Sequence, residues 1–95
     1  MNPSMSETPQ APSLLTFPCE FPIKVMGRRE DGFAQTITEV VQRHAPDFAP
    51  GAVEMRASSN ARYLSVTVTI EATSREQLDA LYTELSKHPL VMMVL

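Results

Sequence analysis

Hydrophobic and polar residues alternate strictly along residues 63–72, the segment YLSVTVTIEA. A period of two predicts a β-strand that turns one face towards a core. The core side carries Leu64, Val66, Val68, Ile70 and Ala72, and the opposite side carries Tyr63, Ser65, Thr67, Thr69 and Glu71. The opposite side therefore faces water, a ligand, a second copy of the chain or another protein.

A helical pattern opens at Glu30, Asp31 and Gly32. The apolar residues that follow have the spacing i, i+4, i+7, i+8, which predicts an amphipathic helix. The two acids are expected in its first turn, where negative charge is favourable. Because Pro46 disfavours helical geometry in the residue before it, the helix is expected to end near residue 44 or 45. Its apolar stripe consists of Phe33, Ile37, Val40 and Val41.

A second helix is predicted between the alternating strand and Pro89. Thr73 or Ser74 is expected to cap it, with Glu76 or Gln77 completing a capping box. Proline cannot continue a helix, so Pro89 marks its end. The apolar face at i, i+3, i+4, i+7 consists of Leu78, Leu81, Tyr82 and Leu85.

Three further segments complete the pattern. Residues 19–28 alternate as a first strand, and Val53 and Met55 alternate with charged neighbours in a shorter one. Residues 90–95, LVMMVL, predict a final buried strand. Right-handed connections close this βαββαβ order into a four-stranded antiparallel sheet, strand order 4-1-3-2, with both helices on one face. The sequence therefore predicts an α+β sandwich of the ferredoxin-like type.

The length and the proline distribution predict one domain with a tail. A chain of 95 residues allows a single domain. Residues 1–18 hold four of the eight prolines and no Lys or Arg, so we expect a disordered tail at 1–18 and the folded domain at 19–95. The tail also lacks the charged start of a secretory signal. Its candidate docking residues are Leu14, Leu15 and Phe17.

Cysteine usage, hydropathy and charge predict a soluble cytoplasmic protein. Cys19 is the single cysteine, which excludes an internal disulfide and a paired-cysteine metal site. No apolar run approaches the roughly 18–20 residues of a membrane span, so no membrane partner is expected. The net charge is −3 with acids and bases interspersed, which argues against charge-driven nucleic-acid binding.

No catalytic arrangement is visible. His44 and His88 have no nucleophile at a suitable spacing, and we interpret them as helix-terminus cations or solvated rings. Asn60 falls in a turn, whereas an acylphosphatase-like enzyme would need it on a central strand. An RNA-recognition domain carries stacking aromatic residues on its central strands, whereas the corresponding strand of this chain offers only Tyr63, at its start. We therefore expect no enzymatic activity, no cofactor and no metal.

The open face of the predicted sheet is the first candidate site. Both helices lie on the apolar side of the strand at 63–72, so its hydroxyl-bearing side stays uncovered. Small hydroxyl and β-branched side chains suit an exposed sheet, and they equally suit a flat contact with a protein. The candidate interaction face consists of Tyr63, Ser65, Thr67 and Thr69.

One edge of the predicted sheet is the second candidate site. The topology gathers arginines there, with Lys87 and His88, and guanidinium groups match carboxylates or phosphates. In ACT-type sensors the loop after the first strand, usually around a glycine, holds an amino acid. The alternative is a solvated edge that Glu30, Asp31 and Glu54 partly neutralise. The candidate ligand-binding residues are Gly27, Arg28, Arg29, Gly32, Arg56 and Arg62.

Four blocks of the sequence resemble a known family. They are FPIKVMG at 21–27, VVQRHAP at 40–46, SSNARYLSVTVTIEAT at 58–73 and LYTELSKHPLVMMVL at 81–95. The chain is similar to the YbeD-like family of small bacterial proteins of unknown function. The resemblance implies a ferredoxin-like, ACT-like fold and a bacterial cytoplasmic protein with a regulatory role, and it assigns no catalytic residue.

Two segments stand out beside this resemblance. Relatives are expected to hold a glycine in the turn where this chain has Asn60, Ala61 and Arg62. Within VVQRHAP, the residues Gln42, Arg43 and His44 are either a partner-facing patch or the solvated end of a helix.

The expectation is a non-enzymatic regulatory or protein-interaction domain that works through its open sheet face. The alternative is an ACT-like sensor of a small amino or organic acid near the loop after the first strand. The expected partner is thus an unidentified protein or a small acidic metabolite. Self-association as a homodimer would also help so small a domain, because it adds buried surface.

Overall fold

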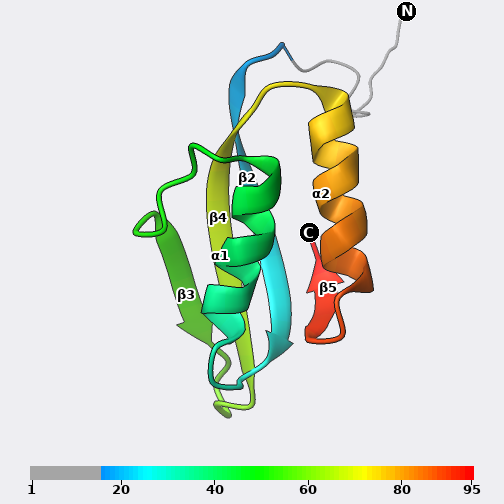
Figure 1. Ribbon diagram of the computed structural model, residues 1–95. Coiled ribbons are helices and arrows are strands. Elements are labelled where there is room, and N and C mark those ends of the chain that lie inside the picture. The colour runs from blue at the N-terminus through cyan, green and yellow to red at the C-terminus, as the bar shows by residue number, and fades with distance from the viewer. Residues whose placement is uncertain (1–15) are drawn as a thin grey trace, which may run out of the picture.

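The computed structural model describes residues 16–95 of the chain. Their elements are β2 (Cys19–Arg28), α1 (Phe33–His44), β3 (Val53–Ala57), β4 (Tyr63–Ala72), α2 (Arg75–Lys87) and β5 (Val91–Val94). The four antiparallel strands lie in the order β3-β4-β2-β5, and both helices pack on the same face of the sheet (Figure 1). The predicted ferredoxin-like sandwich and its strand order are confirmed.

Most of the predicted tail lies outside the described residues, including Leu14 and Leu15. Phe17 is described, and its side chain packs against the core while staying partly exposed.

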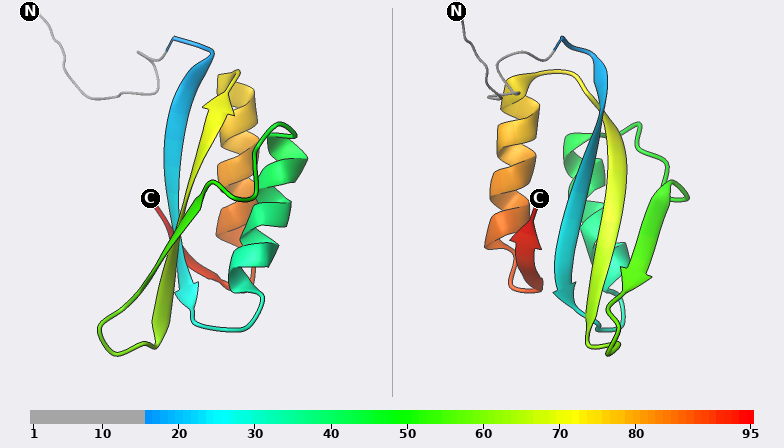
Figure 2. Two further views of the ribbon diagram at one scale, coloured as in Figure 1. Left: turned by 90° about the vertical axis from the view of Figure 1, so that its left-hand side faces the viewer. Right: turned by 180° about the vertical axis from the view of Figure 1, so that it is seen from behind.

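The two central strands are much longer than their neighbours. β2 and β4 pair over ten positions, from Cys19 opposite Ala72 to Arg28 opposite Tyr63. β3 pairs only as far as Val53 opposite Val68. β5 pairs with residues 25–27, and two backbone hydrogen bonds between Lys24 and Leu95 continue this pairing. One end of the sheet is therefore a ribbon of β2 and β4 alone (Figure 2).

The core forms between the sheet and the two helices, as the apolar patterns predict. The helix-facing side chains of the central strands are shielded from solvent, as are the stripes of α1 and α2. Among the described residues no polar or charged side chain is buried. The least exposed large side chains are Phe33, Ile23, Ile37, Ile70, Leu81, Leu85, Val25, Val40, Val41, Val66 and Val68.

The start of α1 differs from the prediction. Glu30 and Asp31 precede the helix, and its first turn contains no acidic residue. The chain turns into the helix through Gly32 at φ 81°, a left-handed conformation that glycine adopts at little cost because it has no Cβ. The expectation of acids in the first turn is therefore wrong, since this turn displaces the helix start to Phe33. The predicted end is confirmed, because α1 stops at His44.

The two edge strands are more exposed than their apolar residues predict. Met55 in β3 has 61% of its surface exposed, and in and beside β5 the values are 61% for Met92, 50% for Met93 and 61% for Leu95. The expectation of a buried final strand is wrong. The helices cover only one face of the sheet, and an edge strand has a neighbour on one side alone.

The N-terminus of α2 contains the predicted cap. The Ser74 hydroxyl accepts a hydrogen bond from the backbone N–H of Gln77 at 3.0 Å. The Gln77 side chain in turn accepts one from the backbone N–H of Thr73 at 2.7 Å. Gln77 also donates through its amide to the carbonyl of His44 at 2.8 Å, which fixes the start of α2 to the end of α1.

Candidate functional site

The open face of the sheet brings together residues from three strands. Thr67 lies in β4 between Lys24 of β2 and Glu54 of β3, and Ser65 lies between Met26 and Arg56 in the next row. A shallow hollow of about 480 Å³ covers this area. Its lining consists of Lys24, Glu54, Met55, Arg56, Ser65 and Thr67.

The charges on the open face are arranged in a row of opposite signs. Lys24 and Glu54 flank Thr67 on its two sides, and both are exposed. No ion pair joins them in the part of the chain that the structure describes. Each charge is therefore available to a partner, and the small hydroxyls between them let a flat surface approach.

Methionines extend the open face towards β5. Met26 in β2 pairs with Met93 in β5, and Leu95 continues the strand beside Lys24. Methionine side chains are flexible and polarisable, so they adapt to the shape of a protein partner. Met93 and Leu95 are both largely exposed, so they give the open face an apolar border.

The predicted ligand-binding edge is formed in part. The backbone N–H of Arg29 donates to the carbonyl of Arg62 at 2.9 Å, which joins the end of β2 to the turn before β4. A hollow of about 360 Å³ lies here. Its lining consists of Arg28, Arg29, Glu30, Ala61, Arg62 and Tyr63.

The other predicted cations lie apart from this hollow. Arg56 lines the open face beside Ser65. His88 serves the turn into β5, where its Nδ1 accepts a hydrogen bond from the backbone N–H of Leu90 at 3.1 Å. The structure therefore brings together Arg28, Arg29 and Arg62 in one hollow, whereas Arg56 lines the neighbouring hollow on the open face.

The two glycines near this edge have separate structural reasons. A Cβ on Gly27 would lie 2.3 Å from the carbonyl oxygen of Leu90 and 2.6 Å from the ring of Phe33. Gly27 thus lets the first strand pass close to its neighbours, and the space beside it is filled. A Cβ on Gly32 would have nothing within 4 Å, so space does not require glycine there. Glycine is favoured at this position because the backbone has a positive φ.

The turn before β4 holds Ala61 at φ 60°, a conformation that a residue with a Cβ adopts only under strain. The Asn60 side chain accepts a hydrogen bond from the Arg62 backbone N–H at 3.0 Å, and the Ser58 hydroxyl accepts one from Tyr63 at 3.2 Å. These bonds hold the turn in shape where relatives were expected to have glycine.

The motif VVQRHAP has a role that sequence reasoning missed. Arg43 and His44 both contact Glu84 of α2, with His44 Nε2 at 2.6 Å from Glu84 Oε1. The carboxylate therefore joins the two helices through two side chains of one motif. Glu84 lies 40 residues beyond His44, so local spacing could not reveal this pairing.

Tyr82 closes the side of the domain next to β5. Its hydroxyl donates to the carbonyl of Leu95 at 3.3 Å, and its ring meets Phe21 edge-on with centroids 6.4 Å apart. Burial raises the pKa of the Tyr82 phenol above 10.0, because a phenolate would lose hydration there.

Two types of feature are absent from residues 16–95. These residues contain no group of three His, Cys, Asp or Glu side chains placed to share a metal ion. None of their helices has the length and apolar character needed to cross a membrane.

Sequence comparison now identifies the family. A model described as "Protein of unknown function (DUF493)" matches residues 12–95. The chain belongs to this family. It is 54% identical to a UPF0250 protein of Ralstonia nicotianae over 93% of its own length and 91% of the relative's. It is 53% identical to the UPF0250 protein of Bordetella pertussis over 96% of this chain and all of that one. The YbeD-like resemblance is confirmed.

Solved structures resemble the fold. Protein HP0495 from H. pylori, a solution structure, superposes with a TM-score of 0.73 at 21% identity, covering 100% of this chain and 96% of that one. The ACT domain from the GTP pyrophosphokinase of Chlorobium tepidum gives a TM-score of 0.60 at 20% identity, covering 80% and 84%. At these identities the likeness shows a shared ferredoxin-like, ACT-like fold and nothing about ligands.

Proposed function

We propose that this domain works by contact with another protein, as a regulatory or interaction module without a reaction of its own. The observation that carries the proposal is the open face centred on Ser65 and Thr67, which no helix of the described chain covers. The lone Cys19 is consistent with a reducing bacterial cytoplasm as the place of action.

The open face has the chemistry of a specific contact. A partner that places a carboxylate against Lys24 and a cation against Glu54 matches both charges and is held in one orientation. Opposite charges improve orientation and choice of partner more than raw affinity. The apolar border at Met26 and Met93 adds surface that water leaves on contact.

Site-directed crosslinking in cells tests the proposal. A photoreactive residue at position 67 should capture a defined partner, and the same residue at position 39 on the exposed side of α1 should not. Lys24→Glu should abolish capture from position 67, because it places two like charges in one row with Glu54. Circular dichroism then checks that the fold is unchanged.

Two outcomes would contradict the proposal. Equal capture from positions 39 and 67 would mean that the open face is not selective. Capture that survives Lys24→Glu would mean that its row of charges has no part in the contact.

A second candidate function rests on the hollow beside Arg28, Arg29 and Arg62. Three guanidinium groups at one edge suit the carboxylate of a small amino or organic acid, and the fold is that of an ACT domain. Such a ligand should raise the free energy of unfolding by about 2.7 kcal/mol at a hundredfold excess over its dissociation constant.

An NMR titration with amino acids and small organic acids tests this second function. Amide shifts confined to residues 27–33 and 58–63 would support it, and Arg29→Glu or Arg62→Glu should remove them. The absence of any shift would leave the protein contact as the function.

A further inference from the structure

The projecting end of β4 has a free backbone edge. The Ser58 backbone N–H donates to the Tyr63 carbonyl at 2.9 Å, so odd-numbered residues of β4 turn their backbone groups towards β3. β3 pairs no further than Val53 opposite Val68. Val53 and Val68 form a non-hydrogen-bonded pair, so the Thr69 N–H lies opposite the Ala52 carbonyl at the end of the ladder. Beyond it, within residues 16–95, the C=O of Thr69 and both backbone groups of Glu71 have no backbone partner.

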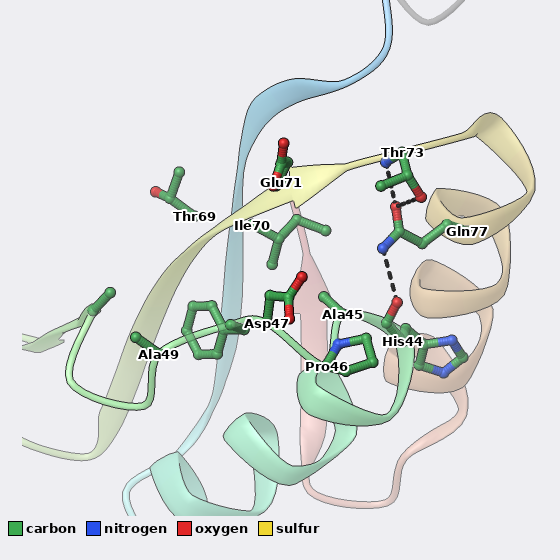
Figure 3. A pocket seen from close by; sticks show the side chains of 12 residues that line it. His44, Ala45, Pro46, Asp47, Ala49, Thr69, Ile70, Glu71, Thr73 and Gln77 are labelled. Carbon is green, nitrogen blue, oxygen red and sulfur yellow. Dashed lines mark hydrogen bonds between the residues drawn. The ribbon is translucent and has the colours of Figure 1, made fainter.

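A groove runs beside this free edge. It has a volume of about 480 Å³ and lies between the end of β4 and the loop that follows α1 (Figure 3). Its floor is apolar, because Ile70, Ala45 and Phe48 are almost fully shielded from solvent. The remaining lining residues are His44, Pro46, Asp47, Ala49, Ala52, Thr69, Glu71, Thr73 and Gln77.

The far wall of the groove is fixed before any ligand arrives. The Phe48 backbone N–H donates to the Ala45 carbonyl at 2.9 Å, and that of Ala52 donates to Ala49 at 2.9 Å. The bond from Gln77 to the His44 carbonyl, drawn in Figure 3, ties the loop to α2. A ligand would therefore meet a preformed wall, and ordering the loop would take little of its binding free energy.

The charge of the groove is negative. Asp47 and Glu71 line it, and both are exposed. Glu20 lies directly opposite Glu71 in the neighbouring strand and adds to the negative charge. The basic residue among the lining, His44, is engaged with Glu84. The groove thus favours a cationic ligand.

We infer that this groove binds an extended, lysine- or arginine-bearing peptide segment of another protein, added as a strand to β4. An unpaired strand edge binds extended chains through backbone hydrogen bonds, and side-chain pockets then select the sequence. The C=O of Thr69 and the N–H and C=O of Glu71 offer the backbone groups, and the carboxylates of Asp47 and Glu71 select basic side chains.

Two other occupants fit less well. A second copy paired edge to edge would set its own Glu71 and Asp47 against these carboxylates, and like charges repel. Residues 1–15 of this chain contain one Glu and no Lys or Arg, so they offer the groove no cationic side chain. The groove shares no lining residue with the hollow at Ser65 and Thr67, although Thr69 was predicted for the same interaction face. The two tests probe different residues, so each proposal can fail alone.

The test is an NMR titration of the isotope-labelled full-length chain with capped octapeptides, up to about 2 mM, which detects millimolar dissociation constants. The probe alternates valine and lysine. One control replaces lysine with glutamate, and a second keeps lysine but carries N-methyl groups on alternate backbone nitrogens, which removes every second donor. The expected result is that only the first peptide shifts the amides of residues 45–49 and 69–72.

Charge variants then locate the contact. Glu71→Gln and Asp47→Asn should each weaken binding roughly two- to fivefold, the range of exposed charge pairs. Glu39→Gln removes one carboxylate from the exposed side of α1 and should leave the affinity unchanged. The exchange of the Glu71 amide with solvent should slow in the complex, because this group becomes bonded.

The remaining outcomes overturn the inference. No shift with the lysine peptide, or shifts outside the groove, would show that the edge does not accept a strand. Equal binding of the glutamate peptide would show that the groove does not select basic side chains. Equal binding of the N-methylated peptide would show that backbone hydrogen bonds do not hold the peptide. In the free protein, shifts at residues 69–72 that depend on concentration would assign the groove to a second copy. Nuclear Overhauser contacts with residues 1–15 would assign it to the chain's own N-terminal segment.

Discussion

The covered and the open faces of the sheet come from the same strands, yet they differ in almost every physical property. In β4, Val66 and Val68 have no exposed surface, while Thr67 between them is reached by solvent. The covered face has only apolar contacts, whereas the open face combines hydroxyls, a row of opposite charges and methionines. Stability therefore resides mainly on one face, and the other is free to carry recognition.

The largest expected effect contrasts the same substitution on the two faces. Leu81 is fully shielded and Leu95 is 61% exposed. Leu81→Ala leaves a cavity and should lower the free energy of unfolding by about 2–5 kcal/mol. Leu95→Ala should change it by no more than about 0.5 kcal/mol. Urea denaturation measures both, and equal losses would break the comparison.

Added volume on the covered side should be tolerated as poorly as lost volume. Gly27→Ala introduces a methyl group 2.3 Å from the Leu90 carbonyl oxygen, which forces the backbone to move. The expected loss in the free energy of unfolding is about 1–3 kcal/mol. Gly51→Ala is the matched control, because nothing lies within 4 Å of its added atom. A stable Gly27→Ala protein would mean that β5 shifts outward at little cost.

The N-terminal cap of α2 tests how much a hydrogen bond within one covering helix contributes to the free energy of unfolding. Ser74→Ala leaves the backbone N–H of Gln77 without its acceptor and should lower the free energy of unfolding by about 1 kcal/mol. Ser74→Asp keeps an acceptor and should retain most of the stability. If thermal denaturation showed the same loss for both variants, the hydroxyl bond would not be the cause.

The smallest effect concerns Tyr82, at the rim where the covered face meets β5. Its folded pKa is raised by burial, so the unfolded chain releases the phenolic proton at lower pH than the folded one. Stability from this group is complete below the unfolded pKa of about 10 and is lost as pH rises through the folded pKa. Tyr82→Phe should flatten this alkaline decline in urea denaturation at increasing pH. An identical decline in both proteins would exclude Tyr82 as its source.

The covered face was predictable from the sequence because burial of one side of a strand or helix requires apolar residues at a regular spacing. The alternation in residues 63–72 and the stripes of both helices identified the core, and the order of elements then fixed the topology. Ser65 and Thr67 followed as open-face residues because a strand has only two sides. Their part in recognition stays a prediction.

The rest depended on contacts and lengths that local patterns do not contain. The pairing of Arg43 and His44 with Glu84 joins two helices far apart in the chain. Arg56 was predicted to lie with the other arginines, and the register of β3 puts it beside Ser65, one row along the open face from Arg28. The groove exists because β3 stops short of the end of β4, and the alternation in β4 says nothing about the length of its neighbour.

The ten-residue pairing of β2 with β4 also bears on how the domain forms. The two strands enclose α1 and β3 in the chain, so even their nearest pair, Arg28 and Tyr63, meets only after a long loop has closed. The entropy cost of closing the loop comes before the contacts that stabilise the closed state. Proteins whose contacts join residues far apart in the chain therefore fold more slowly than helical bundles. We expect the pairing of β2 with β4 to limit the folding rate. The apolar faces of the helices should become stably buried only after these strands have paired.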